Sequence, residues 1–137
     1  MSRSINHPYF LRKSKRDEFW YNVAMKNFIL PGLIDLHIHG AFGWDFSFGD
    51  PDKIDEMLDR MLTCGLTGVM ATLITCREER RMKALRDISV VAARRKKPPH
   101  ILGIYMEGPF LAKSRCGSHP KEMLIKPDLK KLIKIFR

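Results

Sequence analysis

The sequence lacks the features that would place it in several large classes of protein. Its three cysteines, Cys64, Cys76 and Cys116, form no C-x-x-C pair, which argues against a disulfide framework and a structural zinc cluster and fits a reducing cytosol. No apolar run is long enough to span a bilayer, and the apolar-leaning stretch near the N-terminus has no small-residue cleavage site. We therefore expect a cytoplasmic protein without a signal peptide or a membrane segment.

Nucleic-acid-binding motifs are also missing, although the formal net charge is +10. Residues 1–26 hold six Lys/Arg against two Asp/Glu, residues 112–137 hold eight against two, and the charges between these segments balance. No zinc-finger spacing, helix-turn-helix pattern or aromatic–basic strand motif accompanies the basic ends. We expect no sequence-specific nucleic-acid binding, whereas loose binding of anions by the basic ends stays open.

From residue 27 onward, short apolar runs alternate with helical periodicity, a pattern typical of βα units around a parallel sheet. The pattern predicts three strands, at residues 28–35, 68–73 and 101–106. Because a closed (β/α)8 barrel needs about 250 residues, we expect an α/β fold that comprises about the first three βα units of a partial (β/α)8 TIM barrel. We assign residues 27–137 to this incomplete barrel domain and residues 1–26 to a basic segment of uncertain structure.

Helix signals follow each predicted strand. After a long loop at residues 40–50, Asp50 caps a helix that ends at Gly65, and its apolar face consists of Ile54, Met57, Leu58, Met61 and Leu62. Thr75 and Glu78 form a capping box for a second helix, whose apolar positions include Met82, Leu85, Ile88 and Ala92 and which Pro98 and Pro99 stop. A polar loop at residues 107–127 precedes a third amphipathic helix, which begins at Asp128.

His37 and His39 are candidate metal ligands at the end of the first predicted strand. Residues two apart on a strand point to the same side, and two imidazoles on one face suit Zn²⁺ or Fe²⁺. The alternative is a solvated strand end. Asp35 lies one pleat earlier and could orient a ligand histidine, or it could cap a turn or bind a backbone amide instead.

Glu107 closes the third predicted strand, beside a Gly108-Pro109 turn. Alternate strands of a parallel barrel contribute side chains to common interior layers, so Glu107 could reach a metal ion held by His37 and His39. The alternative is an exposed acid at a strand end.

These residues converge on a resemblance to a known family. The segment Pro31-Gly-Leu-Ile-Asp-Leu-His-Ile-His-Gly40 resembles the first-strand signature of the amidohydrolase superfamily. The segment Leu102-Gly-Ile-Tyr-Met-Glu-Gly-Pro-Phe-Leu111, followed by Gly117-Ser-His-Pro120, resembles the third-strand glutamate and the following loop of N-acetylglucosamine-6-phosphate deacetylases. With Gly65-Leu-Thr67 and Ala71-Thr-Leu-Ile-Thr75 between them, the resemblance runs from about Leu30 to Leu129.

The resemblance implies a metal-dependent enzyme that hydrolyses the acetamide of N-acetylglucosamine 6-phosphate to glucosamine 6-phosphate and acetate. His37, His39 and Glu107 would bind one or two divalent ions, Zn²⁺ or Fe²⁺. Ser118 and His119 would contact the amino-sugar phosphate substrate, although both are also ordinary polar residues for a loop. The resemblance places the catalytic acid/base aspartate beyond Arg137, and it implies that the complete enzyme is a homo-oligomer.

Three alternatives remain open at this stage. The substrate could be N-acetylgalactosamine 6-phosphate, handled by a related deacetylase. The chain could be an incomplete and inactive part of such an enzyme, the product of a truncated or decayed gene, because one carboxylate and two histidines supply metal ligands without a free acid/base. It could also be a non-catalytic basic interaction fragment, for which the charge of the C-terminal segment is the sole support. Of these, we expect an incomplete enzyme.

Overall fold

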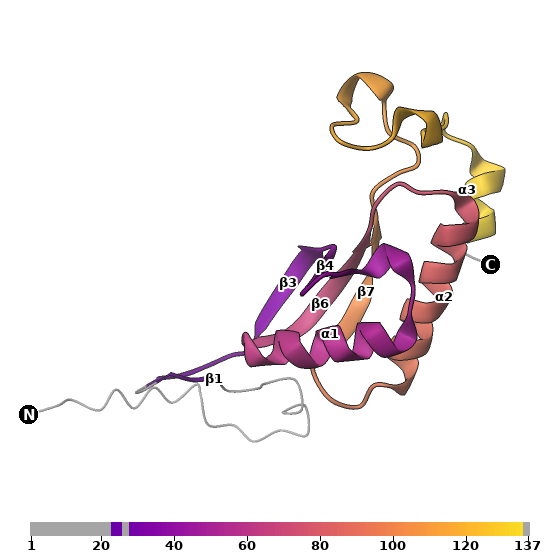
Figure 1. Ribbon diagram of the computed structural model, residues 1–137. Helices are drawn as coiled ribbons and strands as arrows, with labels where there is room; N and C mark the ends of the chain where they lie inside the picture. The colour runs from indigo at the N-terminus through magenta and orange to yellow at the C-terminus, as the bar shows by residue number, and fades with distance from the viewer. Residues whose placement is uncertain (1–22, 26–27, 136–137) are drawn as a thin grey trace, which may run out of the picture.

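The computed structural model describes residues 23–25 and 28–135 (Figure 1). Its centre is a three-stranded parallel sheet in the order β3-β6-β7, formed by β3 (Leu33–Ile38), β6 (Leu66–Leu73) and β7 (His100–Met106). Helices α1 (Pro51–Thr63) and α2 (Glu78–Arg94) follow β3 and β6 and share one hydrophobic core with the sheet. The predicted α/β class with a parallel sheet is confirmed.

Helix α1 forms as the sequence predicts. The Asp50 side chain accepts hydrogen bonds from the backbone N–H groups of Asp52 and Lys53, and Pro51 occupies the first turn. Gly65 follows the helix with a φ of +86°, a conformation that favours glycine. The face of α1 that packs on the sheet is buried and consists of Ile54, Met57, Leu58 and Met61.

The central strand β6 is buried along most of both faces, as expected for a parallel strand with neighbours on either side. Helix α2 packs on it with a stripe of buried residues, Arg81, Ala84, Ile88 and Val91. The predicted stripe was wrong at Ala92, which is exposed. The prediction used apolar residues only and so left out Arg81, which is buried in this stripe. The predicted buried face of α2 was therefore rotated relative to the observed one.

The predicted capping box at the start of α2 is also wrong. The helix begins at Glu78 with Arg77 in the N-cap position, and no side chain caps it. The hydroxyl of Thr75 instead donates a hydrogen bond to the backbone carbonyl of Glu107. A partner 32 residues away in the sequence therefore takes the group that a local pattern assigned to the helix.

The single strand predicted at residues 28–35 is two strands. β2 (Phe28–Leu30) pairs antiparallel with β1 (Val23–Met25) in a separate hairpin, and only β3 enters the parallel sheet. The break falls at Pro31 and Gly32, where a Cβ on Gly32 would lie 2.1 Å from Cγ2 of Thr67. β1 lies inside the segment 1–26, whose structure the sequence left uncertain; residues 1–22 and 26 lie outside the described part.

The segment predicted as a long loop at residues 40–50 contains short elements. β4 (Gly40–Ala41) and β5 (Trp44–Asp45) form a small hairpin, and the 3-10 helix η3 (Phe46–Phe48) follows it. Phe46 is fully buried in the core, so the segment covers one end of the sheet.

The polar segment after β7 carries two further 3-10 helices, η4 (Lys113–Arg115) and η5 (Lys121–Met123). Helix α3 (Leu129–Ile135) follows in the segment where a third helix was predicted, and Asp128 caps it by accepting hydrogen bonds from the N–H groups of Lys130 and Lys131. An ion pair of 2.7 Å between Lys134 and Glu78 ties α3 to the start of α2.

The face of the sheet away from α1 and α2 has no covering element in the described part (Figure 1). Ile34 and Leu102 lie on either side of Gly68 on this face, and their side chains are 47% and 39% exposed. None of the described helices combines the length and the apolar character needed to cross a membrane.

Candidate metal centre at the carboxyl ends of the strands

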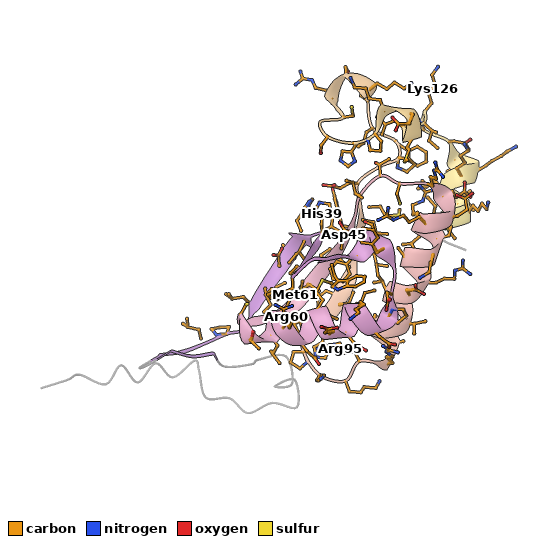
Figure 2. All side chains as sticks on the ribbon, viewed as in Figure 1. His39, Asp45, Arg60, Met61, Arg95 and Lys126 are labelled. Atoms are coloured by element: carbon orange, nitrogen blue, oxygen red, sulfur yellow. The ribbon has the colours of Figure 1, made fainter. Side chains whose placement is uncertain are left out.

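The candidate ligands lie where β3 and β7 end. His37 is the second-to-last residue of β3, and His39 directly follows that strand. Glu107 directly follows β7. Because the sheet is parallel, these carboxyl ends meet at one edge. Figure 2 shows His39 at this edge and Arg95 at the opposite end of the sheet.

The Glu107 carboxylate is the meeting point of three imidazoles. Its Oε1 lies 3.0 Å from Nε2 of His37, and its Oε2 lies 3.3 Å from Nε2 of His39 and 3.5 Å from Nε2 of His119. Ligand atoms of His37, His39 and Glu107 all lie within 4.8 Å of one another. The side chains are 51% exposed for His37, 38% for His39, 22% for Glu107 and 14% for His119, so the cluster opens to solvent on the side of His37 and His39.

An irregularity in β3 sets the direction of the two strand histidines. Between Asp35 and Ile38 the register against β6 slips, with Ile38 packed towards the hydrophobic core. Asp35 Oδ1 accepts a hydrogen bond of 2.9 Å from the backbone N–H of His37 inside this irregular stretch. Of the interpretations open for Asp35, the structure thus places its carboxylate on a backbone amide, that of the candidate ligand His37.

The ring of His37 has two ring neighbours. It lies edge-on to His39, with 5.3 Å between ring centroids, and it is tilted against Tyr105 of β7 at 5.2 Å. These contacts limit the rotation of an imidazole that is otherwise half exposed.

The backbone of Glu107 is held by the neighbouring strand β6. Its N–H donates to the carbonyl of Leu73 at 2.9 Å, and its carbonyl accepts from Oγ1 of Thr75 at 2.7 Å. Sequence reasoning missed Thr75 as part of the site because the Thr75/Glu78 spacing suggested a helix cap.

The two residues predicted to bind substrate have different surroundings. The loop brings His119 to Glu107, and the backbone N–H of His119 donates to the carbonyl of Cys116 at 3.0 Å. Nδ1 of His119 is buried without a hydrogen-bond partner in the described part of the chain. Ser118, one residue earlier, is exposed.

The donor set fits a divalent cation of borderline softness. Two imidazole nitrogens and one carboxylate are the ligands that Zn²⁺ uses in catalytic sites, and imidazole also suits Fe²⁺. A carboxylate placed between imidazoles neutralises part of the charge that such an ion would bring. Beside this cluster, Nδ1 of His119 is a buried hydrogen-bonding group to which no described residue offers a partner.

Fold and cluster together place the chain among the α/β proteins that carry imidazole and carboxylate side chains at the carboxyl ends of parallel strands. No protein-family model matches it. It is 34% identical over 110 residues to the N-acetylglucosamine-6-phosphate deacetylase of Bacillus subtilis, an alignment that covers 74% of this chain and 26% of the relative. The rat protein of the same name is 35% identical over 102 residues, with 70% and 24% covered.

Solved structures give the same result. The N-acetylglucosamine-6-phosphate deacetylase of Thermotoga maritima matches with a TM-score of 0.67 and 27% identity, over 76% of this chain and 28% of that one. A point mutant of the Mycobacterium smegmatis protein of the same name, in complex with N-acetyl-D-glucosamine-6-phosphate, matches with a TM-score of 0.64 and 30% identity, over 77% of this chain and 27% of that one. The chain is a relative of the N-acetylglucosamine-6-phosphate deacetylases and spans about a quarter of their length.

Proposed function

We propose that the chain carries part of the active site of an N-acetylglucosamine-6-phosphate deacetylase. In this proposal His37, His39 and Glu107 hold one or two divalent ions, Zn²⁺ or Fe²⁺, and Ser118 and His119 contact the amino-sugar phosphate. The convergence of the three ligand side chains within 4.8 Å is the observation that carries the proposal. The names of the relatives supply the reaction and the substrate.

The residues of the chain divide the chemistry among them. A bound divalent ion would lower the pKa of a water molecule towards about 7 and polarise the acetamide carbonyl. His37 and His39 would offer Nε2 in their neutral forms, and Glu107 would offer its carboxylate. His119, with its unpartnered Nδ1, would hydrogen-bond the sugar and orient it, and the exposed hydroxyl of Ser118 would contact the sugar from the same loop.

Proton transfer to the leaving amine needs a carboxylate that is free to exchange a proton. Glu107 is the acid whose carboxylate contacts all three histidines, and Asp35 is engaged with a backbone amide. We therefore propose that the acid/base aspartate belongs to a part of the enzyme beyond Arg137 and that the 137-residue chain does not turn over substrate by itself.

For the fold, we propose that β3, β6 and β7 with their helices are about three βα units of a (β/α)8 barrel, and that residues 27–137 are an incomplete barrel domain preceded by a basic segment, 1–26. The uncovered, partly apolar face of the sheet supports this assignment, because the inner face of a barrel is packed against other strands. The extent of the match to each solved relative, about a quarter of its length, agrees with it.

The proposal commits to the glucosamine substrate. An N-acetylgalactosamine-6-phosphate deacetylase of Escherichia coli O157:H7 also matches, but at 28% identity, below the 34% of the Bacillus subtilis relative. The basic interaction fragment has no comparable support, because the matched relatives carry the names of deacetylases.

The test is metal binding by the purified chain, measured by titration calorimetry with Zn²⁺ after removal of metal. We expect binding of one or two ions per chain and a Glu107→Gln variant that binds at least tenfold more weakly, since a ligand is lost. Glu56→Gln, at an exposed acid on α1, is the matched control and should bind like the unchanged chain. Absence of binding, or an equal loss in both variants, would refute the proposed site.

Activity is tested separately by following acetate release from N-acetylglucosamine 6-phosphate with proton NMR, with N-acetylgalactosamine 6-phosphate in parallel. The chain alone should release no acetate from either sugar. Steady turnover by the chain that Glu107→Gln abolishes would refute the proposal that its active site is incomplete. Faster hydrolysis of N-acetylgalactosamine 6-phosphate would refute the proposed substrate.

A further inference from the structure

Thr75 stands directly beside the backbone of the candidate ligand Glu107. It lies two residues beyond the end of β6, and only 4% of the residue is exposed. Its Oγ1 donates to the carbonyl of Glu107 at 2.7 Å. A buried hydroxyl is normally hydrogen-bonded. The Thr75 hydroxyl finds its acceptor across the sheet, at the residue that follows β7.

The contact closes a clamp around Glu107. On one side the N–H of Glu107 donates to the carbonyl of Leu73, and on the other its carbonyl accepts from Thr75. Gly108 completes the fit, because it has a φ of +87° and a Cβ at that position would lie 2.2 Å from the Thr75 hydroxyl oxygen. Both polar groups of the Glu107 backbone are thus fixed to the end of β6, and the next residue leaves room for the hydroxyl that fixes them.

The Thr75 hydroxyl does not cap the nearby helix α2. Asp50 and Asp128 cap α1 and α3 through their side chains, whereas α2 begins at Glu78 without a side-chain cap. Thr75 lies three residues before Glu78 and could have capped α2, but its hydroxyl is bonded to the carbonyl of Glu107 instead.

We propose that Thr75 is a positioning residue for Glu107: its hydroxyl fixes the strand end from which the carboxylate reaches the metal. The inference rests on the proposed function, because it assumes that Glu107 is a ligand. Without the hydroxyl, the carbonyl of Glu107 loses its partner and the strand end gains freedom. The carboxylate then occupies several positions, and the ion binds to only some of them.

The same strand offers a matched control in Thr67. This residue is 3% exposed, and its Oγ1 donates to the carbonyl of Leu33 at 3.3 Å. It therefore makes the same kind of buried hydroxyl–carbonyl bond between neighbouring strands, but at the other end of β6, away from Glu107. A purely structural role would make Thr67 and Thr75 equivalent in a metal-binding measurement.

The experiment measures the Zn²⁺ dissociation constant of the full chain and of Thr75→Val, Thr75→Ser and Thr67→Val, with folding checked by circular dichroism. Thr75→Val, which keeps the shape but lacks the hydroxyl, should bind about tenfold more weakly, as when a group that orients a ligand is removed. Thr75→Ser, which keeps the hydroxyl, should stay within about twofold of the unchanged chain, and so should Thr67→Val.

Each outcome decides. If the unchanged chain binds Zn²⁺ and Thr75→Val binds it equally well, the inference fails and the proposed metal site stands; if the unchanged chain binds none, both fail. A loss in Thr67→Val equal to that in Thr75→Val would make the effect structural and overturn the inference. Should Thr75→Val not fold, Thr75→Ala takes its place. If neither folds while Thr75→Ser does, Thr75 is a structural residue of the sheet and the inference is wrong.

Discussion

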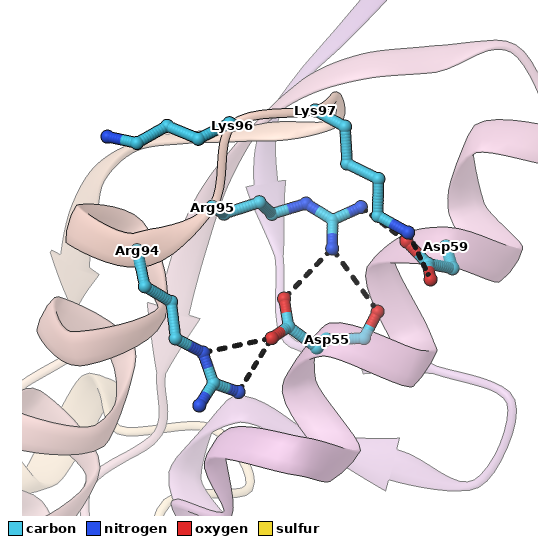
Figure 3. Close-up of a pocket in the computed structure, with 6 residues that line it drawn as sticks. All are labelled: Asp55, Asp59, Arg94, Arg95, Lys96 and Lys97. Carbon is cyan, nitrogen blue, oxygen red and sulfur yellow. Dashed lines mark hydrogen bonds and ion pairs between the residues drawn. The ribbon is translucent and has the colours of Figure 1, made fainter.

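Arg95 should contribute more to stability than any neighbouring charge, although nothing in the sequence distinguishes it from Arg94. It follows α2 and reaches towards Asp55 of α1 (Figure 3). Its side chain is only 2% exposed. Its Nε donates to the carbonyl of Pro99 at 3.0 Å and its Nη2 to that of Pro98 at 2.8 Å. Its remaining donors form ion pairs of 2.9 Å with Asp55 and 2.7 Å with Asp59, both on α1.

The loss on replacing Arg95 with methionine can be worked out from these contacts. Two buried carbonyls lose their donors, at about 1–3 kcal/mol for each unsatisfied group. The carboxylates lose less, because Asp55 keeps its ion pair with Arg94 at 2.6 Å and Asp59 keeps Lys97 at 2.8 Å. Their partial exposure, 30% and 45%, lowers that part further. We expect the free energy of unfolding to fall by about 3 kcal/mol, the lower end of the range for a broken buried pair.

Urea denaturation followed by circular dichroism measures this loss, and Arg94→Met is the control. Arg94 contacts the same Asp55 carboxylate but is 43% exposed, so its replacement should cause only a small fraction of the Arg95 effect. The Arg95 effect should also persist in 1 M NaCl, because most of it comes from buried hydrogen bonds that salt does not screen. A loss below about 1 kcal/mol for Arg95→Met, or equal losses for the two variants, would refute the reasoning.

Three further predictions concern the core, acid stability and thiol reactivity. Leu58→Ala should lower the free energy of unfolding by about 2–5 kcal/mol, because Leu58 is fully buried on α1; a loss below about 1 kcal/mol in urea denaturation would contradict its place in the core. Hydrogen bonds from Lys97 and, to a smaller extent, from Arg95 hold the pKa of Asp59 below its ordinary value. Its stabilising effect is therefore present above the unfolded-state pKa of about 3.9 and is lost as the pH falls through the folded-state value, so Asp59→Asn should flatten the acid limb of a stability–pH curve, and an unchanged limb would contradict this. Burial raises the pKa of the Cys76 thiol while Cys64 is exposed, so a thiol reagent should label Cys64 first in the native chain; mass spectrometry of the peptides decides, and equal labelling of both would contradict the fold.

Much of the fold follows from local rules that the sequence states clearly. The Asp50 cap, the apolar stripe of α1 and the apolar runs of β6 and β7 act over a few residues, and the structure confirms each of them. The meeting of His37 and Glu107 was predicted for a different reason. Parallel strands place their carboxyl ends at one edge, so a residue's position at the end of a strand decides its neighbours.

The parts that the sequence does not reveal depend on partners far along the chain. Thr75 and Glu107 are 32 residues apart, and the Thr75/Glu78 spacing suggested a nearer partner for the hydroxyl. The burial of Arg95 and Phe46 was not predicted, for a related reason. Charge patterns and loop composition predict exposure, whereas these two side chains are buried by contacts with α1, the Pro98–Pro99 turn and the central core.

The two sides of the candidate metal centre are held in different ways, and this difference decides where a single group can control it. β3 and β7 each pair with β6 alone within the described residues, but the side chains of His37 and His39, at the end of β3, are 51% and 38% exposed. Glu107 is 22% exposed and has both backbone polar groups bonded to the end of the central strand. The exposed ring of His37 is held by ring contacts with His39 and Tyr105. A ligand at the end of a clamped strand depends on the clamp, so the Thr75 hydroxyl is the single group on which the geometry of the site depends most.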